Sequence, residues 1–509
     1  MFTFSTRAAK LSLLPVTTLA AAAYAANRGR DVGYMDALSE CPSADSETLQ
    51  NWSGTHSSDF VKVYSPPSLS ALKTLVASTA DKIRCVGSGL SPNGLSFPSS
   101  STTCVNLSEL NTVLGLENDV VEVEAGMTVH DLLAELAKEG FTLPVLASIS
   151  EQTMGGFVNV SAHGTGLGIG PIDAFVQSFK IVTPGFGVLE LSRSDSGYQK
   201  KLFDLILVGL GCFGVVYSYK IKVVPKYNLL QKQFVLTREE AVRDMESLKR
   251  DYKHMRMMWL PYEDCVVVVA SNPSDGSELP KLGVEGDPLQ PMRELLKEKG
   301  SLDGKLVDGL GMGELRDELL NLDVLNPEWV KKVNAAEARF WKKNSGFVYD
   351  SNSKLLNFDC GGQQHVLELC FETTAGGATQ GADAEFMLQL LNAIESEGLP
   401  APGPIEQRWS AGSSATMSPA HGEGGDFCWV GGIMYLTTED AGIRNKITST
   451  FSGTYTDLML KVGKAFGAKT HWAKREKGSV EAEEFNRIRK LLDPEGRCGN
   501  EWTTEVFGF

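Results

Sequence analysis

The sequence predicts an α+β fold, and three observations carry that prediction. The N-terminal half alternates short apolar runs, which are typical of strands, with amphipathic helical patterns and two glycine-rich stretches. The C-terminal half continues with helix and strand patterns in mixed order. The stretch that matches a dinucleotide fingerprint is followed by a strand pattern, which argues against a doubly wound nucleotide-binding fold.

The composition is that of a soluble globular protein with two or three domains. The chain has 509 residues, of which 42% are hydrophobic and 22% are charged. Its formal net charge of −15 argues against binding to nucleic acid, because phosphate contacts need a basic surface. The nine cysteines form no C-x-x-C pair, so mostly reduced thiols are expected. Motifs for metalloproteases, P-loop enzymes and serine hydrolases are absent from the sequence, and no metal site is predicted.

The first residues predict a targeting presequence over residues 1–45. From Met1 to Arg30 the chain has basic, serine and threonine residues but no acidic residue, which is typical of a mitochondrial transit peptide. The apolar run Leu11–Ala26 also resembles a secretory signal, and it is short for a membrane span. Mitochondrial targeting is therefore the prediction, with secretion and an uncleaved anchor over residues 11–26 as alternatives.

Regular elements are predicted on both sides of the glycine-rich stretches. Ser68 is the predicted N-cap of a helix whose apolar residues follow at helical spacing. Val121–Ala125 alternates as a half-buried strand does, and Thr128–Glu139 predicts a helix. Val176–Leu191 predicts a hairpin that turns at Pro184–Gly187.

A loop suited to ligand binding follows the strand pattern of Lys82–Val86. Gly87, Gly89 and Gly94 allow close backbone approach, and consecutive N–H groups can form a concave anion-binding nest. Serine and asparagine side chains add neutral donors, so the loop can hold a diphosphate without a lysine or arginine. Taken alone, this stretch favours an ordinary loop between strands, and ligand binding depends on what the rest of the chain supplies.

A second glycine-rich region covers Leu146–Gly156 and Ser161–Gly166. Small residues dominate it, so a large flat ligand such as an isoalloxazine ring can lie against the backbone. His163 is the lone histidine of this region, and a hydrogen-bonded structural role is the prediction for it.

The sequence Gly209–Gly214 matches G-x-G-x-x-G, which requires a following helix. Val215–Val224 alternates apolar and polar residues instead, as a strand does. We therefore reject a Rossmann domain and, with it, NAD as the cofactor.

The C-terminal half predicts a second α+β unit. Helices are predicted at Thr237–Tyr252, Met292–Lys299, Leu315–Leu322 and Ala384–Glu397. Strands are predicted at Met255–Leu260, Cys265–Ala270, His365–Glu372, Ile405–Ser410 and Phe427–Tyr435. Ser271–Pro288 is rich in proline, glycine and polar residues and predicts a loop or linker.

Three short motifs carry candidate chemistry. Glu406 and Arg408 lie two apart on a predicted strand, so both project from one face and can grip a polyhydroxylated substrate; an exposed ion pair is the alternative. His471 and Lys474 share a face if their segment is helical, and a basic helix end is the alternative. Cys360, beside two glycines, is either a buried small hydrophobe or an accessible, oxidation-sensitive thiol.

Together these segments resemble the aldonolactone oxidoreductases of the vanillyl-alcohol-oxidase flavoprotein superfamily, and most of all their plant-type galactonolactone dehydrogenases. The matching segments occur in family order: Asn51–His56, Val86–Gly94, Glu151–Gly156, Ala162–Gly166, Phe358–Gln364, Pro404–Trp409, Met417–Ala420 and His471–Lys474. They span nearly everything after the presequence. The stretch around Gly276–Pro288 and the tail after Cys498 match poorly.

The resemblance implies a two-subdomain, PCMH-type FAD-binding domain over residues 48–225, an α+β cap or substrate domain over 226–470, and a C-terminal segment, 471–509, that returns to the flavin. The implied FAD-binding residues are Val86, Gly87, Ser88, Gly89, Leu90, Ser91, Pro92, Asn93, Ala147, Ser148, Thr153, Gly156, Ser161, His163, Gly164 and Val215. Relatives that attach FAD covalently carry histidine at the position of Leu90. Because leucine has no nucleophilic atom, the FAD is expected to be non-covalent.

The resemblance also implies a catalytic set of Glu406, Arg408, His471 and Lys474, in which Glu406 and Arg408 bind the lactone. The implied reaction is oxidation of L-galactono-1,4-lactone to L-ascorbate with cytochrome c as electron acceptor, because members that use oxygen well typically have glycine at the position of Ala147. The alternatives are an oxygen-using L-gulono- or D-arabinono-1,4-lactone oxidase and an added role in respiratory complex I assembly. The implied location is the mitochondrial inner membrane, facing the intermembrane space.

Overall fold

The computed structural model describes residues 41, 43–98, 102–277, 279, 286–299, 304–358, 361–373, 381–422, 424–475, 478–480 and 482–508. Most of the predicted presequence, including its apolar run over residues 11–26, lies outside these ranges, as does Cys360. Within them, no helix has both the length and the apolar character needed to cross a membrane.

A four-stranded sheet opens the described chain. Its strands are β1 (Ser43–Gln50), β2 (Ser57–Tyr64), β3 (Lys82–Val86) and β4 (Thr102–Asn106), in the order β1-β2-β4-β3. Strand β4 runs parallel to both β2 and β3, so helix α3 (Leu69–Ser78) crosses over between β2 and β3. Ser68 caps α3 by accepting a hydrogen bond from the backbone N–H of Ala71, as predicted.

A five-stranded antiparallel sheet follows. Its strands are β5 (Val113–Glu117), β6 (Val120–Glu124), β8 (Val176–Thr183), β9 (Gly187–Ser192) and β10 (Val215–Lys222), in the order β5-β6-β10-β8-β9. It is accompanied by α4 (Val129–Lys138), α5 (Met154–Asn159), α6 (Gly197–Ile206), two 3-10 turns (Gly94–Ser96 and Ile172–Phe175) and the small pair β7 (Phe141–Thr142) and β11 (Val224–Pro225). The predicted hairpin is confirmed as β8–β9. The chain enters strand β10 directly after Gly214, so the rejection of a Rossmann unit is confirmed as well.

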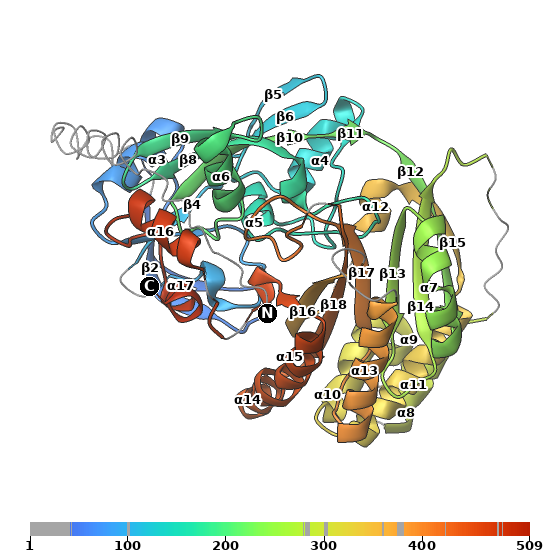
Figure 1. Cartoon of the computed structure of the whole chain (residues 1–509). Coiled ribbons are helices and arrows are strands. Elements are labelled where there is room, and N and C mark those ends of the chain that lie inside the picture. Colours follow the sequence, from blue (N-terminus) through green and yellow to red (C-terminus); the bar gives the residue numbers. More distant parts are fainter. Residues whose placement is uncertain are drawn as a thin grey trace, which may run out of the picture.

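An eight-stranded antiparallel sheet forms the centre of the C-terminal half (Figure 1). Its strands, in spatial order, are β15 (Gly346–Ser351), β12 (Asn228–Leu236), β14 (Val266–Pro273), β13 (His254–Trp259), β17 (Ile405–Ala411), β18 (Asp426–Tyr435), β16 (Gln364–Glu372) and β19 (Lys469–Thr470). The five predicted strands are all present. The predicted polar loop from Ser271 is wrong for its first three residues, because β14 continues to Pro273, paired with β12.

The helices of this half are α7 (Arg238–Asp251), α8 (Gln290–Lys299), α9 (Gly304–Gly309), α10 (Met312–Asp323), α11 (Pro327–Lys343), α12 (Asn352–Leu356), α13 (Ala382–Glu397), α14 (Ala441–Ser449), a π-helical turn (Thr450–Tyr455) and α15 (Thr456–Ala465). The last elements are a 3-10 turn (Trp472–Lys474), α16 (Glu483–Leu492) and α17 (Glu501–Phe507). The four predicted helices are present, whereas α9, α11, α12 and α14 to α17 were not predicted.

The two faces of the eight-stranded sheet differ in chemistry. One face carries apolar side chains such as Met257, Leu369 and Val430, which join a buried hydrophobic cluster with the helices. The pleat directs alternate residues to the other face, where Glu368 of β16 and Arg408 of β17 meet. The charged face therefore offers polar groups from which a site can be built, and the apolar face packs the sheet against its helices.

The C-terminal segment packs against the N-terminal half (Figure 1). The side-chain amide of Asn93 donates to the carbonyl oxygens of Trp472 and Arg475 at 2.7 and 2.8 Å. The amide of Asn500 donates to the carbonyl of Leu95 at 3.1 Å. In Figure 1 the red helices α16 and α17 accordingly lie against the blue N-terminal strands.

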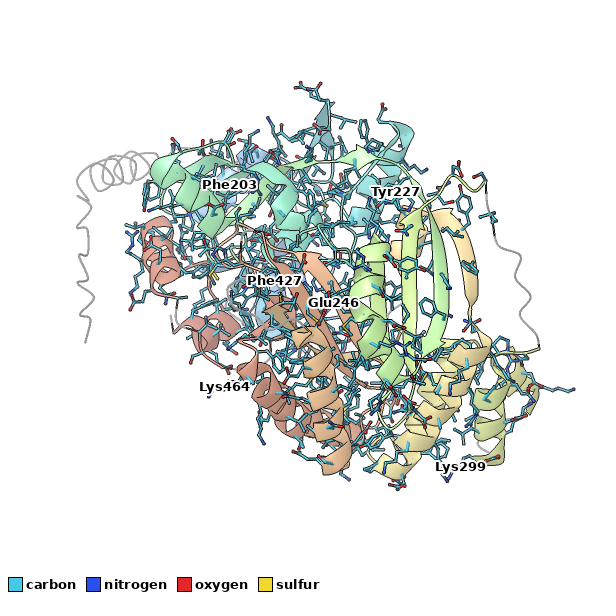
Figure 2. All side chains as sticks on the ribbon, turned by 45° about the vertical axis from the view of Figure 1, so that its right-hand side comes forward. Phe203, Tyr227, Glu246, Lys299, Phe427 and Lys464 are labelled. Atoms are coloured by element: carbon cyan, nitrogen blue, oxygen red, sulfur yellow. The ribbon has the colours of Figure 1, made fainter. Side chains whose placement is uncertain are left out.

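Each half has its own large hydrophobic core. Figure 2 labels Phe203 of α6, which is fully buried in the core of the N-terminal half. It also labels Lys299, which lies at the outer end of α8. The second core joins the helices to the apolar face of the eight-stranded sheet.

Candidate active site

Residues of the two glycine-rich regions line two adjacent cavities. The inner cavity is lined mainly by apolar residues and glycines: Cys85, Val86, Gly87, Leu95, Leu107, Ala125, Thr153, Gly156, Leu210, Val215 and Val216. The loop cavity is lined by residues 87–92, residues 147–149, Thr153, Gly156, His163, Arg408, His471 and Lys474. Since Gly87, Thr153 and Gly156 line both cavities, the two are parts of one trough.

The two glycine-rich regions form this trough because they pack directly on each other. A Cβ atom on Gly87 would lie 2.5 Å from the hydroxyl oxygen of Thr153, so only glycine fits there. Thr153 in turn caps helix α5. The Ser88 hydroxyl donates to the carbonyl oxygen of Glu151, which ties the first loop to the second.

The segment Asn51–His56 fixes the other side of the first loop. The backbone N–H of Trp52 donates to the Gly89 carbonyl at 2.8 Å, and the Asn51 amide donates to the Ser91 carbonyl at 3.0 Å. The loop is therefore held from both sides and does not depend on a ligand for its shape.

A third cavity, of about 270 Å³, lies against the charged face of the eight-stranded sheet. We call it the sheet cavity. It shares with the loop cavity Leu90, Pro92, Ser148, Ile149, Arg408 and Lys474. We call the region around these shared residues the junction; a ligand in the trough and a small molecule on the sheet would meet there.

The structure brings most of the predicted cofactor-binding residues to the trough. Those that line it are Val86, Gly87, Ser88, Gly89, Leu90, Ser91, Pro92, Ala147, Ser148, Thr153, Gly156, His163 and Val215. Three do not line it. Asn93 holds the C-terminal segment, Ser161 contacts the hydroxyl of Ser418, and the carbonyl of Gly164 contacts the His163 ring.

The four predicted catalytic residues also converge at the junction. Strand register places Arg408 of β17 opposite Arg256 of β13 and Trp429 of β18. Glu406 lies one pleat further along, with its carboxylate 3.1 Å from Arg256 Nη1 and 3.4 Å from Arg408 Nε. Arg408 is buried, so the alternative of an exposed surface pair does not describe it.

Glu368 of β16 is the centre of this charge cluster, and sequence reasoning missed it. Its carboxylate lies 2.6 Å from Arg408 Nη2, 2.5 Å from Lys474 Nζ and 3.2 Å from His163 Nε2. Its side chain is 2% exposed. An acidic residue inside the otherwise apolar strand pattern of residues 366–371 was the available signal, because a charge is rarely buried unless it is paired.

The carboxylates of this cluster are held in their charged form. Burial alone would raise the pKa of Glu368, but Lys474, His163 and Arg408 overcome burial and hold that pKa well below its usual range. Burial opposes ionisation of Glu406 too, and Arg408 and Arg256 lower its pKa. The junction therefore presents two carboxylates and three cations, Arg256, Arg408 and Lys474, at neutral pH.

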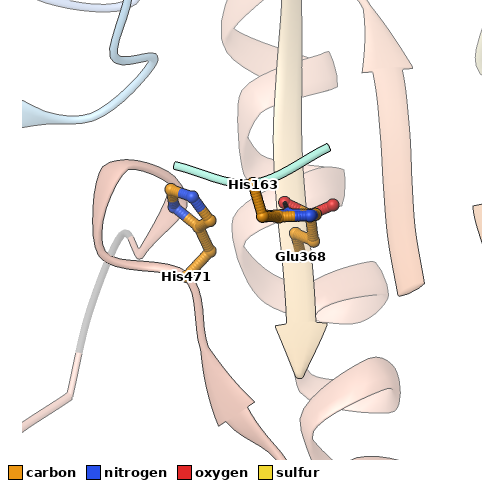
Figure 3. A group of neighbouring side chains, drawn as sticks. All are labelled: His163, Glu368 and His471. Atoms are coloured by element: carbon orange, nitrogen blue, oxygen red, sulfur yellow. Dashed lines mark ion pairs between the residues drawn. The ribbon is translucent and has the colours of Figure 1, made fainter. Parts of the chain in front are cut away.

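The two histidines are buried beside this cluster (Figure 3). His163 stacks on the indole of Trp429, with ring centroids 3.7 Å apart. Burial is the main cause that lowers the pKa of both His163 and His471. Nδ1 of His471 accepts a hydrogen bond from the backbone N–H of Ala473, so the neutral ring carries its proton on Nε2.

A metal centre at His163, Glu368 and His471 is disfavoured, although their ligand atoms lie within 4.8 Å of one another (Figure 3). The Glu368 carboxylate already has two cationic partners, Arg408 and Lys474. A divalent cation would have to displace them or share the carboxylate with two positive charges.

The donor set of the trough suits FAD. Among the described residues, those lining the loop cavity include two cations and several neutral hydroxyl, amide and imidazole groups but no carboxylate, which fits a diphosphate and the polar edge of a flavin. The inner cavity is mostly apolar and glycine-lined, which fits an adenosine moiety. Residues 87–91 would hold the diphosphate, and Ala147, Ser148, His163 and His471 would lie beside the flavin.

Comparisons with known proteins agree with this geometry. The chain matches a family described as D-arabinono-1,4-lactone oxidase over residues 219–506 and an FAD binding domain over residues 60–192. It is 38% identical over 497 residues to L-galactono-1,4-lactone dehydrogenase 1, mitochondrial, of Oryza sativa subsp. japonica, covering 91% of this chain and 84% of the relative. It is 37% identical over 503 residues to the mitochondrial L-galactono-1,4-lactone dehydrogenase of Brassica oleracea, covering 91% and 83%.

Among solved structures, cholesterol oxidase from B. sterolicum superimposes with a TM-score of 0.72 at 14% sequence identity, covering 92% of this chain and 98% of that one. This similarity confirms the predicted fold class, and the FAD-binding match confirms FAD as the cofactor.

Proposed function

The chain belongs to the D-arabinono-1,4-lactone oxidase family and is an FAD-dependent aldonolactone oxidoreductase, and on this premise we propose that it oxidises L-galactono-1,4-lactone to L-ascorbate and passes the electrons to cytochrome c. The observation that carries the proposal is the junction at which Arg408 and Lys474 line both the loop cavity and the sheet cavity. A lactone on the sheet would there lie next to the FAD, which when bound accepts a hydride.

The chain's own residues would bind and orient the lactone. The Glu406 carboxylate, charged and fixed by Arg256 and Arg408, is an acceptor for a substrate hydroxyl. Arg408 and Lys474 place positive charge where negative charge arrives during the reaction. The carbon that carries the 2-hydroxyl loses a hydride and that hydroxyl loses a proton; enolisation of the resulting 2-keto-lactone gives L-ascorbate.

We propose non-covalent FAD, because Leu90 lines the loop cavity and has no nucleophilic atom. The inner cavity does contain the thiol of Cys85. Burial raises its pKa to about 12, which keeps the thiol protonated and poorly nucleophilic. Acid precipitation of the purified protein tests this: the flavin is expected in the supernatant, and flavin that pellets with the protein would contradict the proposal.

Two features favour cytochrome c over oxygen as electron acceptor. Ala147 lines the loop cavity, and its methyl group would restrict access of oxygen to the flavin. The net charge of −15 would speed encounter with a basic electron carrier. Location at the mitochondrial inner membrane, facing the intermembrane space, is part of the same proposal, supported by the mitochondrial names of the relatives.

The decisive experiment measures lactone-dependent reduction of cytochrome c by the purified protein, with L-galactono-1,4-lactone and a panel of other aldonolactones. The expected result is reduction of cytochrome c with little peroxide. Peroxide formation without cytochrome c reduction would favour the oxidase alternative. Absence of turnover with every aldonolactone and both acceptors would refute the proposal.

A further inference from the structure

The sheet cavity continues well beyond the junction. Antiparallel register places Glu406 and Glu368 on either side of Gly431, and these three residues form one row across the sheet at the junction. Two pleats further along, Tyr435 lies opposite Gln364. At ~3.3 Å per residue the two rows are about 13 Å apart. The cavity thus has a reacting end and a remote end, and nothing in the chemistry above uses the remote end.

The remote end has a buried polar wall. Arg316 of α10 donates from Nε and Nη2 to the carboxylate of Glu337 on α11, at 3.0 and 2.5 Å. Its Nη1 donates to the phenol oxygen of Tyr435 at 3.1 Å. The indole of Trp341 donates to the same carboxylate at 3.0 Å. Glu337 is fully buried, and Arg316, at 9% exposure, lines the cavity with Tyr435 and Gln364.

A contribution to folding stability does not explain this buried ion pair. A buried ion pair seldom adds more stability than well-packed apolar residues of the same volume, because both charges lose their hydration. Arg316 of this pair nevertheless lines a cavity together with large apolar and aromatic side chains, among them Trp52, Met312 and Trp341. A role in ligand recognition accounts for its position.

The wall is suited to neutral hydroxyl groups. An arginine side chain has five N–H donors, and three of those of Arg316 are used in the contacts above, which leaves donors for a ligand. Glu337 neutralises the guanidinium at 2.5 Å, so the wall offers directional hydrogen bonds without a net positive charge. An anionic ligand would gain little there, whereas an alcohol would gain a well-oriented donor.

We propose that the remote end of the sheet cavity is a subsite for the hydroxylated exocyclic tail of the lactone. Arg316 donates to the tail hydroxyls, Tyr435 positions the guanidinium, and the Trp52–Met312–Trp341 surface packs against the tail carbons. The subsite selects lactones by the length of this tail. This inference rests on the proposed function, since it assumes that the lactone ring occupies the junction.

The test compares aldono-1,4-lactones of four, five, six and seven carbons with the FAD-loaded enzyme. The four-carbon lactone has the ring and its 2-hydroxyl but no tail. In the wild type, kcat/KM is expected to rise with tail length at least to six carbons, by about tenfold for each hydroxyl that gains a hydrogen bond. A kcat/KM that does not change with tail length would overturn the inference.

Two variants locate the effect. Tyr435→Phe removes the oxygen that holds Arg316 Nη1, and Arg316→Lys keeps the charge opposite Glu337 but loses the guanidinium fork. Both are expected to lower kcat/KM for the six-carbon lactone by about tenfold, mainly through KM, and to leave the four-carbon lactone unchanged. Tyr455→Phe is the matched control: Tyr455 is equally buried but lies in the π-helical turn Thr450–Tyr455 and is not among the residues that line the sheet cavity.

A second readout is the dissociation constant of an unreactive 2-deoxy lactone with an intact tail, measured from the change in flavin absorption. In both variants this dissociation constant should rise by the same factor by which kcat/KM for the six-carbon lactone falls. If the variants lost equal factors of kcat/KM for the four- and six-carbon lactones, the effect would be structural and the tail subsite would be refuted. If the wild type oxidised no lactone at all, the proposed function itself would fail, which is a distinguishable outcome.

Discussion

The charge cluster around Glu368 gives the sharpest prediction, for the substitution Glu368→Gln. Glutamine keeps the size of the side chain but removes its charge. It leaves Arg408 and Lys474, at 2.6 and 2.5 Å, without the anion that they share. The Glu368 side chain is 2% exposed, so water does not replace the lost partner.

The expected cost in stability follows from this burial. Removing one partner of a buried pair costs about 3–5 kcal/mol. The entropy of unfolding is about 2.1 cal/mol/K per residue, or roughly 1 kcal/mol/K for a chain of 509 residues. The melting temperature should therefore fall by about 3–5 °C if the chain unfolds as one unit. The kcat/KM for the lactone should fall by roughly 10²-fold, because two cations at the junction lose their fixed positions.

Differential scanning calorimetry and steady-state kinetics measure both effects. Glu372→Gln is the matched control, since Glu372 lies four residues further along the same strand, is half-buried, and has no ion pair among the described contacts. A double variant, Glu368→Gln with Lys474→Met, should lose less stability than the sum of the two single changes. A Glu368→Gln enzyme with wild-type melting temperature and kinetics would refute the central role of this carboxylate.

Two further predictions follow from other residues. Ala147→Gly should raise lactone-dependent peroxide formation severalfold relative to cytochrome c reduction; Ala162→Gly, in the same cavity, is the control, and equal effects of the two would contradict a specific oxygen barrier. Burial lowers the pKa of His254 to about 4 from an ordinary 6.5. Between these two pH values His254 binds a proton in the unfolded chain but not in the folded chain. The free energy of unfolding should therefore fall by about 3 kcal/mol as the pH drops from 6.5 to 4. His254→Asn should flatten this dependence in urea titrations, whereas the same change at exposed His130 should not; identical pH profiles for wild type and His254→Asn would contradict the assignment.

Local patterns were sufficient to predict much of the fold. The alternation around Glu406 and Arg408 correctly places both on one face of β17. The strand pattern after Gly214 correctly excludes a Rossmann unit. Strands β15, at the edge of the sheet, and β12, the strand next to it, escaped prediction because most of their side chains are half-buried and alternation is weak. Helix α11 escaped despite its Asn326 cap and Pro327 start, since charged residues interrupt its apolar face.

The centre of the site could not be predicted in the same way. Glu368 contacts one residue 40 positions away and another 106 positions away, and its third partner, His163, belongs to the N-terminal half. No local pattern encodes such contacts, because they arise only when the eight-stranded sheet, the second glycine-rich loop and the C-terminal segment pack together. His163 was predicted to be a structural histidine, and its stacking on Trp429 and contact with Glu368 place it in the wall of the site.

This cluster also separates two explanations of how Arg408 would act. The junction holds three cations, Arg256, Arg408 and Lys474, against the carboxylates of Glu368 and Glu406, which leaves one net positive charge. If positive charge alone favoured the reaction, Glu368→Gln would raise the net charge to two and speed catalysis. If orientation matters more, the same change frees Arg408 and Lys474 from their common anchor and slows it. The buried, short contacts of Glu368 favour orientation, so the sign of the change in kcat decides between the two.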